Sequence, residues 1–416
     1  MITHFLRLAL AHTLAPFTFN RWEPGELDLQ VENLGIYVHI PFCASFCSFC
    51  PYHKDLYAPE PAAQFAQALL KEIDLVSASS PGVRPKVGTV YFGGGSPALL
   101  LEYLPGIVEK LKSRFEITGN LGLELHPRDI GSETLQQLKT IGFNMVSVGV
   151  QSFSPGSTQA LGRPSLDSAA KLRLVKAAGF QAVDVDLLFG YAGQTAAALL
   201  ADFRQAVENG ATQVSTYPFI EFSYAKKSIK PLDRANKKIM LEQLLRLSRE
   251  LGFERTSIWT FAKQDTPKYS SVTRDNFIGF GPSATTLLSD IFKINTFSLP
   301  EYLRMIDAGQ VPGALALKFT PRTRALYWLF WSAYNLNIDE ENFRLLFNTG
   351  LKARFGPELF IAQALGFIEP HGRGYRLTEK GACAFHLIEQ KYTNQYIDKT
   401  WRILKTQPWP KNIKLY

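Results

Sequence analysis

Three cysteines close together in the sequence are the residues most able to do chemistry. Cys43, Cys47 and Cys50 lie within the stretch IYVHIPFCASFCSFCPYH, and the chain has one other cysteine, Cys383. Three thiolates on one short loop can hold a metal and leave a coordination position open, because structural zinc sites and complete iron–sulfur sites ordinarily use four protein ligands. The spacing therefore predicts a metal centre that can bind a further ligand.

Three uses of these cysteines are open on the spacing alone. Disulfides need pairs, and three cysteines on one loop give no framework of the secreted kind. Zinc is possible because His53 would complete a Cys3His set. An iron–sulfur cluster with one exposed iron is the third use, since neighbouring aromatic residues would exclude water from it. These residues are Phe42, Phe46, Phe49 and Tyr52.

The cysteine loop follows a short strand in a repeating pattern of strands and helices. Residues 35–40, GIYVHI, predict a buried strand that ends at the loop. A helix is expected from Pro59 to Ile73, and further helices near 98–113, 132–141, 166–178 and 195–209. Further strands are expected at Thr89–Phe92, Leu121–Leu125, Met145–Val150, Ala182–Leu188 and Gln213–Tyr217. Such alternation is typical of parallel βαβ units, which place sites at the carboxyl ends of strands.

The last quarter of the chain has a different pattern. After a helix over 234–251 and a strand near 254–260, residues up to about 315 predict loops and turns. Helices follow at 322–335, 340–348 and 352–365, and GFIEPHGRGYRLTEKG predicts two short strands around a glycine-rich turn before a further helix. This order is typical of a winged-helix module.

Composition indicates a globular protein of 416 residues, 46% of them hydrophobic. No apolar run reaches the roughly 20 residues that span a bilayer, and Phe5–Phe19 predicts a short amphipathic helix rather than a secretory signal. Free cysteines favour the cytoplasm. Of the net charge of +8, residues 318–416 carry +7, from 15 Lys and Arg against 8 Asp and Glu, which is compatible with an anionic partner or only with a soluble surface.

Polar and glycine residues follow several of the predicted strands. Gly93, Gly94 and Gly95 permit a close backbone approach to a ligand, and Pro97 can start a helix whose first N–H groups face an anion. Other candidates include a carboxylate, an amide and a guanidinium, which suit hydrogen bonding to a polar ligand. They are Glu124, Gln151, Arg163, Asp184 and Asp186.

The spacing CxxxCxxC resembles the radical S-adenosylmethionine superfamily. The preceding YVHIPFC narrows this resemblance to the branch of oxygen-independent coproporphyrinogen III oxidase, whose relatives include a haem chaperone, a haem-degrading enzyme and radical methylases. It implies that Cys43, Cys47 and Cys50 hold a [4Fe-4S] cluster whose fourth iron chelates S-adenosyl-L-methionine. One electron then yields a 5′-deoxyadenosyl radical, which abstracts hydrogen from the substrate.

The resemblance also implies an architecture. It favours an α/β fold with a partial (β/α)6 barrel over residues 35–260, preceded by an N-terminal extension, residues 1–34. A linking region, residues 261–317, would complete the active site, and residues 318–416 would form a winged-helix-like domain.

Cofactor contacts can be carried over residue by residue. GGGSP matches the family's glycine motif, so Gly94, Gly95 and Ser96 are expected near the methionine amino group, and Glu124 near the same end of S-adenosylmethionine. Gln151 and Arg163 match further contacts, and Asp186, in its LLFG context, matches an acidic residue near the ribose hydroxyls. Aromatic and histidine neighbours complete the set. These are Phe49 as a cofactor contact, Tyr37 as both a cofactor contact and a catalytic residue, and His39 as a catalytic residue.

Other matches concern the substrate. Tyr217 and Glu221 resemble the haem-chaperone branch, while Arg274, Asn276 and the 279–283 loop match a family loop near cofactor and substrate. Four cations are candidates to bind substrate carboxylates, and Cys383 is expected to be a small buried side chain. The cations are Arg128, Arg255, Lys263 and Arg274.

Two departures leave the subgroup open. Tyr52 occupies the place of the oxidase's fourth cysteine, and TRDNF stands where the chaperone branch has a histidine-containing stretch. The leading hypothesis is a radical enzyme acting on a tetrapyrrole or similar conjugated molecule, with an electron donor such as a flavodoxin or ferredoxin. The alternatives are a haem-binding chaperone and a radical C-methyltransferase. Nucleic acid is the least favoured partner.

Overall fold

The computed structural model describes residues 15–25, 27–80, 82, 84–225, 229–267 and 275–415. The chain divides into two compact units. The barrel unit contains Tyr37–Ile73 and Val87–Ser271, and the second unit contains Met1–Ile36, Asp74–Lys86 and Val272–Tyr416. Each is described by itself.

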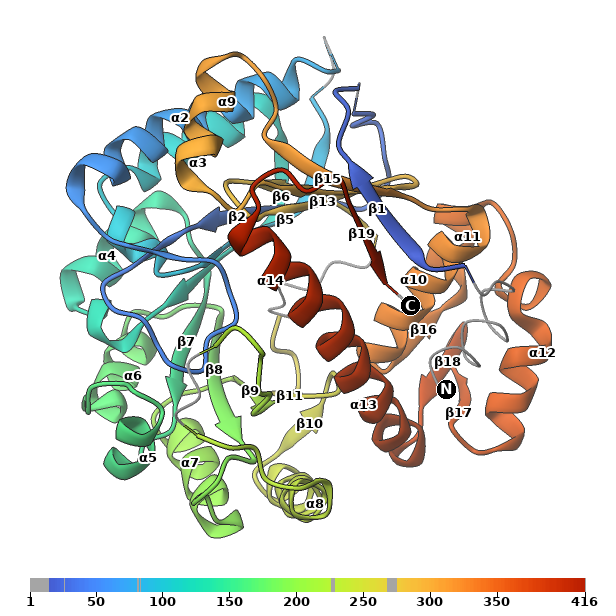
Figure 1. The fold of residues 1–416 in the computed structure, drawn as a ribbon. Coiled ribbons are helices and arrows are strands. Elements are labelled where there is room, and N and C mark those ends of the chain that lie inside the picture. Colours follow the sequence, from blue (N-terminus) through green and yellow to red (C-terminus); the bar gives the residue numbers. More distant parts are fainter. Residues whose placement is uncertain are drawn as a thin grey trace. The chain divides into compact units, whose positions relative to one another are not determined.

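Six strands of the barrel unit lie side by side in chain order, as predicted (Figure 1). They are β2 (Leu34–Ile40), β5 (Lys86–Gly94), β6 (Glu116–Leu125), β7 (Met145–Gln151), β8 (Ala182–Phe189) and β9 (Gln213–Pro218). Strands β6 to β9 pair in parallel, and most β8 side chains are buried, as expected for a sheet covered on both faces. The α/β fold with a partial barrel is confirmed.

Helices follow these strands, and some of them end at a glycine. Gly142, for example, ends α4 in the left-handed conformation at φ 111°, which glycine adopts at little cost. The helices are α2 (Pro59–Ser77), α3 (Leu104–Arg114), α4 (Ser132–Ile141), α5 (Pro155–Ala160), α6 (Ser168–Ala177), α7 (Ala196–Glu208) and α8 (Arg234–Glu250). Where one strand was predicted near 254–260, two short antiparallel strands form instead, β10 (Phe253–Arg255) and β11 (Thr260–Lys263).

The second unit contains strands that the sequence analysis missed. They are β1 (Phe17–Arg21), β12 (Asn276–Phe280), β13 (Thr285–Leu288), β14 (Ile291–Asn295), β15 (Gly313–Lys318) and β19 (Asn412–Leu415). The predicted loops up to residue 315 are therefore wrong. The predicted helix over Phe5–Phe19 is wrong at Phe17–Phe19, because β1 lies between β15 and β19 and hydrogen-bonds to both; its residues before 15 lie outside the described residues.

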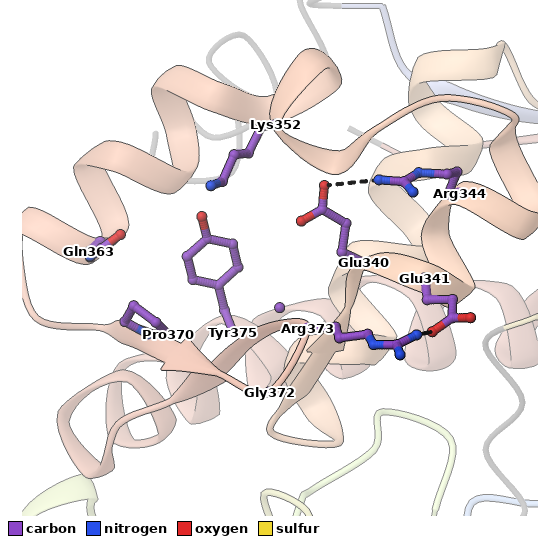
Figure 2. A pocket seen from close by; sticks show the side chains of 10 residues that line it. Glu340, Glu341, Arg344, Lys352, Gln363, Pro370, Gly372, Arg373 and Tyr375 are labelled. Atoms are coloured by element: carbon purple, nitrogen blue, oxygen red, sulfur yellow. Dashed lines mark hydrogen bonds and ion pairs between the residues drawn. The ribbon is translucent and has the colours of Figure 1, made fainter.

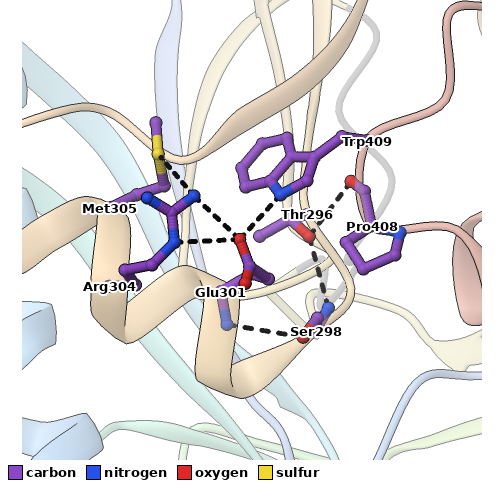
Figure 3. A network of polar contacts seen from close by, with 7 residues as sticks. All are labelled: Thr296, Ser298, Glu301, Arg304, Met305, Pro408 and Trp409. Carbon is purple, nitrogen blue, oxygen red and sulfur yellow. Dashed lines mark hydrogen bonds and ion pairs between the residues drawn. The ribbon is translucent and has the colours of Figure 1, made fainter.

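A polar network fastens the C-terminal segment to α9 (Leu299–Asp307) within this unit (Figure 3). Trp409 donates its indole N–H to Glu301 at 2.7 Å, and Arg304 donates to the same carboxylate oxygen at 2.8 Å. Thr296 donates to the carbonyl oxygen of Pro408 at 3.3 Å. This network holds residues 408–409, just before β19 in the chain, against Thr296 and α9.

The C-terminal helices and the two strands of the wing come in the predicted order, with one short strand after the first helix and one last helix that were not predicted. They are α10 (Pro321–Tyr334), β16 (Asn337–Asp339), α11 (Glu340–Phe347), α12 (Leu351–Ala364), β17 (Ile368–His371), β18 (Gly374–Leu377), α13 (Glu379–Thr393) and α14 (Lys399–Thr406). Strand β18 lies between β16 and β17. The rings of Trp328 and Phe343, whose centres are 5.2 Å apart, belong to the hydrophobic core that packs against this small sheet. Among the described helices, none is long and apolar enough to cross a membrane.

Candidate functional site

The cysteine loop begins at the carboxyl end of β2. Its base is a small parallel ladder between β3 (Phe42–Cys43) and β4 (Asp55–Leu56). The thiols of Cys43, Cys47 and Cys50 are partly exposed, and none forms a disulfide. Among the described residues, no group of three or more His, Cys, Asp or Glu side chains could hold a single metal ion.

Arg163 fastens the cysteine loop to the segment after α5. Its Nε donates to Cys47 Sγ at 3.2 Å, and its guanidinium lies 5.3 Å from the centre of the Phe49 ring. Ser48 Oγ adds a hydrogen bond to the carbonyl oxygen of Leu161 at 2.9 Å. The loop therefore has a fixed place at the strand ends.

The glycine turn at the end of β5 lies against the start of the same loop. Gly95 N donates to Ile40 O and Ser96 N to Phe42 O, both at 2.7 Å. A Cβ on Gly95 would collide with the Phe42 backbone, and one on Gly94, whose φ is 110°, would lie 2.7 Å from the His39 ring. Contact with the protein itself therefore accounts for these two glycines. The Ser96 hydroxyl donates to Asp129.

Glu124 lies beside this turn with its carboxylate held by neutral donors. Tyr91 OH donates to Oε1 at 2.8 Å and Gly94 N donates to Oε2 at 3.1 Å. Burial raises the pKa of Glu124, and these two hydrogen bonds partly oppose the rise. A carboxylate enclosed in this way would be stabilised by an incoming cation such as an ammonium group.

Tyr37 and His39 form a chain of hydrogen bonds that ends on the cysteine loop. His39 Nε2 lies 3.1 Å from the carbonyl oxygen of His53, so it carries the proton, and Tyr37 OH donates to Nδ1 at 3.0 Å. Burial, together with the repulsion that a charged His39 would feel from the nearby His53, lowers the pKa of His39 to about 3. Both ring nitrogens are thus used within the protein. His53, the fourth ligand of the zinc alternative, lies 3.5 Å from Asp55.

Gln151 ends β7 in an unusual conformation. Its φ is 69°, the strand register shifts just before it, and its side chain is buried. Left-handed backbone at a residue other than glycine costs free energy and clusters at ligand sites. Arg163 donates to the carbonyl oxygen of Gly149, two residues earlier, so Gln151 and Arg163 lie together.

Asp186 lies on β8, on the same side of the strands as Asp184. Ser147 Oγ donates to Asp186 at 3.0 Å, and Ser215 Oγ donates to Asp184 at 2.9 Å. Burial raises the pKa of both carboxyl groups. The sequence analysis named both aspartates and missed the two serines, although Ser147 is the polar residue that alternates with valines in MVSVGV.

The thiols also show what kind of group they would hold. Burial raises the pKa of Cys43 to about 12, and the nearby Cys50 thiol adds to the rise. Three thiolates so close together need a strongly positive centre, because metal binding is what keeps such thiols deprotonated. A partly exposed three-thiol loop with the Arg163 donor at one sulfur fits an iron–sulfur cluster with one iron open.

The cations predicted to bind substrate, and Cys383, do not lie together in one place. Arg128 follows β6, near enough to His126 to lower that residue's pKa. Arg255 donates to the carbonyl oxygen of Ile258, and the Lys263 backbone N–H bonds to Thr212, at the opposite end of β9 from the cysteines. Arg274 lies outside the described residues. Cys383 is partly exposed rather than buried, because its α13 turn is only half covered.

Two further predicted segments have structural contacts of their own. Glu221 forms an ion pair with Lys230 at 3.5 Å, and Tyr217 at the end of β9 is 38% exposed. In the second unit, Asn276 donates to the carbonyl oxygen of Glu32 at 2.8 Å, and Asn295 donates to Gly281 at 2.9 Å.

A hollow of about 670 Å³ in the winged-helix module is a separate feature (Figure 2). Lys352 and Gln363 from α12 and Tyr375 from β18 line it. Ion pairs join Glu340 to Arg344 and Glu341 to Arg373 at its edge. These pairs neutralise most of the charge, so the hollow is not a strongly cationic surface.

Comparison with known proteins identifies a domain within the chain. Residues 37–206 match the model of the Radical SAM superfamily. The oxygen-independent coproporphyrinogen III oxidase of Synechocystis sp. is 24% identical over 384 residues, which cover 84% of this chain and 82% of that protein. The heme chaperone HemW of Bacillus subtilis is 24% identical over 286 residues, 65% of this chain and 75% of the relative.

A solved structure shares the fold over nearly the whole chain. Coproporphyrinogen III oxidase (HemN) from Escherichia coli, which is a radical SAM enzyme, matches with a TM-score of 0.77 at 22% identity. The match covers 94% of this chain and 98% of that one.

Proposed function

Since the chain carries a Radical SAM superfamily domain over residues 37–206, we propose that it is a radical enzyme that acts on a tetrapyrrole or a similar conjugated molecule. The cofactors of this superfamily are a [4Fe-4S] cluster and S-adenosyl-L-methionine, which together supply a 5′-deoxyadenosyl radical for hydrogen abstraction. The observation that carries the proposal is the meeting of the cysteine loop, the glycine turn and Arg163 at the strand ends.

In this proposal Cys43, Cys47 and Cys50 hold the cluster, and Arg163 keeps the loop in place. Glu124 binds the cofactor's ammonium group, because its buried carboxylate is held by neutral donors and gains from a positive partner. The Gly94–Ser96 turn supplies the wall on which that end of the cofactor lies.

Different residues would bind the rest of the cofactor, including its ribose. Gln151 offers an amide that can both donate and accept, and Asp186 accepts from the ribose hydroxyls. Tyr37 and His39 keep the start of the cysteine loop in place, and Phe49 excludes water from its edge.

The tetrapyrrole substrate is supported by the coproporphyrinogen oxidase relatives, one of which aligns with 84% of the chain. Arg128, which like Arg163 lies near His126 at the strand ends, is our candidate to bind a substrate carboxylate. A flavodoxin or ferredoxin is the proposed electron donor, since the cluster needs one electron for each radical.

Anaerobic reconstitution with iron and sulfide followed by dithionite and S-adenosylmethionine tests the proposal. We expect 5′-deoxyadenosine by liquid chromatography, and with coproporphyrinogen III a product that has lost two carboxyl groups. Cys47→Ala should abolish both, whereas Cys383→Ala, a cysteine outside the site, should leave both intact. A wild-type protein that binds only zinc, or that forms no 5′-deoxyadenosine, would refute it.

A haem carrier is a second candidate because of the likeness to HemW of Bacillus subtilis. It predicts stoichiometric haem binding, seen as a shifted Soret band, without turnover of coproporphyrinogen III. Titration of the reconstituted protein with haem, followed by the oxidase assay, separates the two candidates.

A further inference from the structure

Two acidic side chains lie one above the other on the same face of β8. Asp184 is 3% exposed and Asp186, two residues nearer the strand end, is partly exposed. In the parallel ladders Asp184 lies opposite Ser147 and Gln213, and Asp186 lies opposite Ser215. The proposed function uses Asp186 alone and gives Asp184 no role.

Hydrogen-bond donors to the pair are neutral hydroxyls. Ser147 Oγ donates to Asp186 at 3.0 Å, and Ser215 Oγ lies 3.1 and 2.9 Å from the two carboxylate oxygens of Asp184. Ser147 lies opposite Asp184 in the ladder but gives its one hydrogen to Asp186. Neutral donors compensate the charge of a buried carboxylate only in part, so two negative charges on one face of the strand remain unfavourable.

Among the described residues, neither aspartate forms an ion pair, and Thr260, behind Ser215, is uncharged. Glu124 on β6 is a further negative neighbour of Asp186, while Arg163 is a weak opposing influence. Burial raises the pKa of Asp184 to about 6, and burial with the nearby Asp184 raises that of Asp186 well above its usual value. Adjacent buried carboxylates without a cation titrate as a pair that keeps one proton.

We propose that Asp184 and Asp186 together hold one proton in the ligand-free protein and release it when S-adenosylmethionine binds beside them. This inference rests on the proposed function, which places the cofactor next to Asp186. The cofactor brings ribose hydroxyls that donate to Asp186 and a sulfonium with a fixed positive charge, and both stabilise the ionised carboxylates in place of the proton. The carboxyl O–H dissociates, the proton passes to solvent, and both carboxylates remain ionised in the complex.

Calorimetry on the reconstituted protein counts the protons. Titration with S-adenosylmethionine at pH 7 in two buffers of different ionisation enthalpy should show about one proton released per cofactor bound. The apparent affinity should rise up to tenfold per pH unit while the pair titrates. Asp184→Asn removes one carboxylate, so Asp186 ionises beforehand and the release should fall toward zero.

Asp202→Asn is the matched control. Asp202 is also buried with a raised pKa, but its carboxylate accepts from Ser152 Oγ and Phe153 N outside this pair. This variant should release as many protons as the wild type. Wild-type binding without proton release, or an undiminished release in Asp184→Asn, would overturn the inference.

Infrared spectroscopy tests the pair without the cofactor. The ligand-free protein at neutral pH should show the carbonyl band of a buried protonated carboxyl group, shifted in heavy water and absent in Asp184→Asn. A missing band in the wild type overturns the inference. Failure of S-adenosylmethionine to bind at all, with the band present, would refute the proposed function and leave the shared proton established.

Discussion

Single glycines decide how closely the turn after β5 approaches the cysteine loop. Replacing Gly95 by alanine should be severe, because the added Cβ meets the Phe42 backbone, which cannot move away as a flexible side chain would. We expect a loss of unfolding free energy on the order of 3 kcal/mol, as for other overpacked sites, and a lower iron content after reconstitution. Denaturant unfolding and iron analysis provide the measurements.

Gly106→Ala is the control for this glycine prediction. Gly106 lies within helix α3 and a Cβ there meets nothing within 4 Å, so alanine should stabilise the protein by up to about 1 kcal/mol. Equal effects of the two substitutions would show that the close approach to Phe42 does not matter.

His39 gives the stability a pH dependence whose sign follows from its lowered pKa. The folded protein keeps the ring neutral down to a pKa of about 3, whereas the unfolded chain protonates it near 6.5. Its contribution is therefore complete above pH 6.5 and is lost as the pH falls from there toward 3. In His39→Gln the unfolding free energy should fall less steeply over this range, by about 1.4 kcal/mol per pH unit. Denaturant unfolding at several pH values measures the slope, and parallel slopes for variant and wild type would contradict the assignment.

At the scale of elements, Arg163 joins three segments that are distant in sequence. It contacts the cysteine loop at Cys47 and Phe49 and the end of β7 at Gly149. Arg163→Ala should weaken S-adenosylmethionine binding roughly tenfold or more, since hydrogen bonds from a charged donor contribute about 1.5–3 kcal/mol. Lysine should restore little of this, because it lacks the planar fork.

Calorimetry with the cofactor and the rate of cluster loss in air measure the effect of Arg163. Arg173→Ala is the control, because Arg173 makes its hydrogen bond to Asn209 away from the cysteine loop. If the two alanine variants bind the cofactor equally well, Arg163 does not position the loop.

Elements with a regular pattern could be predicted from the sequence, and those fixed by distant partners could not. Strand β8 is apolar except for Asp184 and Asp186, and helix α4 ends at Gly142. Strand β1 needs two partners from the other end of the chain, which no local pattern reveals. The same holds within the site, where Cys47 was evident from its spacing but the hydrogen bond to it from Arg163 was not.

At the scale of the whole molecule, helix α12 of the winged-helix module exposes apolar side chains, although residues 318–416 carry a net charge of +7. Helix α12 exposes Phe360 at 72%, Ile361 at 55% and Leu365 at 50%, where phosphate contacts would require cations. In gel-shift titrations run at about 150 mM salt, we expect no binding of duplex DNA. Tight binding that weakens steeply with added salt would contradict this expectation.

The pairing of β1 with β15 and β19 also sets the order in which the two units can fold during protein synthesis. On the ribosome the barrel unit has all its residues once position 271 has emerged, whereas β1 waits for strands encoded at positions 313–318 and 412–415. The first strand that the structure describes is therefore among the last to pair with its neighbours. In a nascent chain stalled before position 313, β1 would lack both partner strands, so Phe19 could not pack on Phe292 as it does in the folded protein. The exposed Phe19 side chain could then be bound by chaperones.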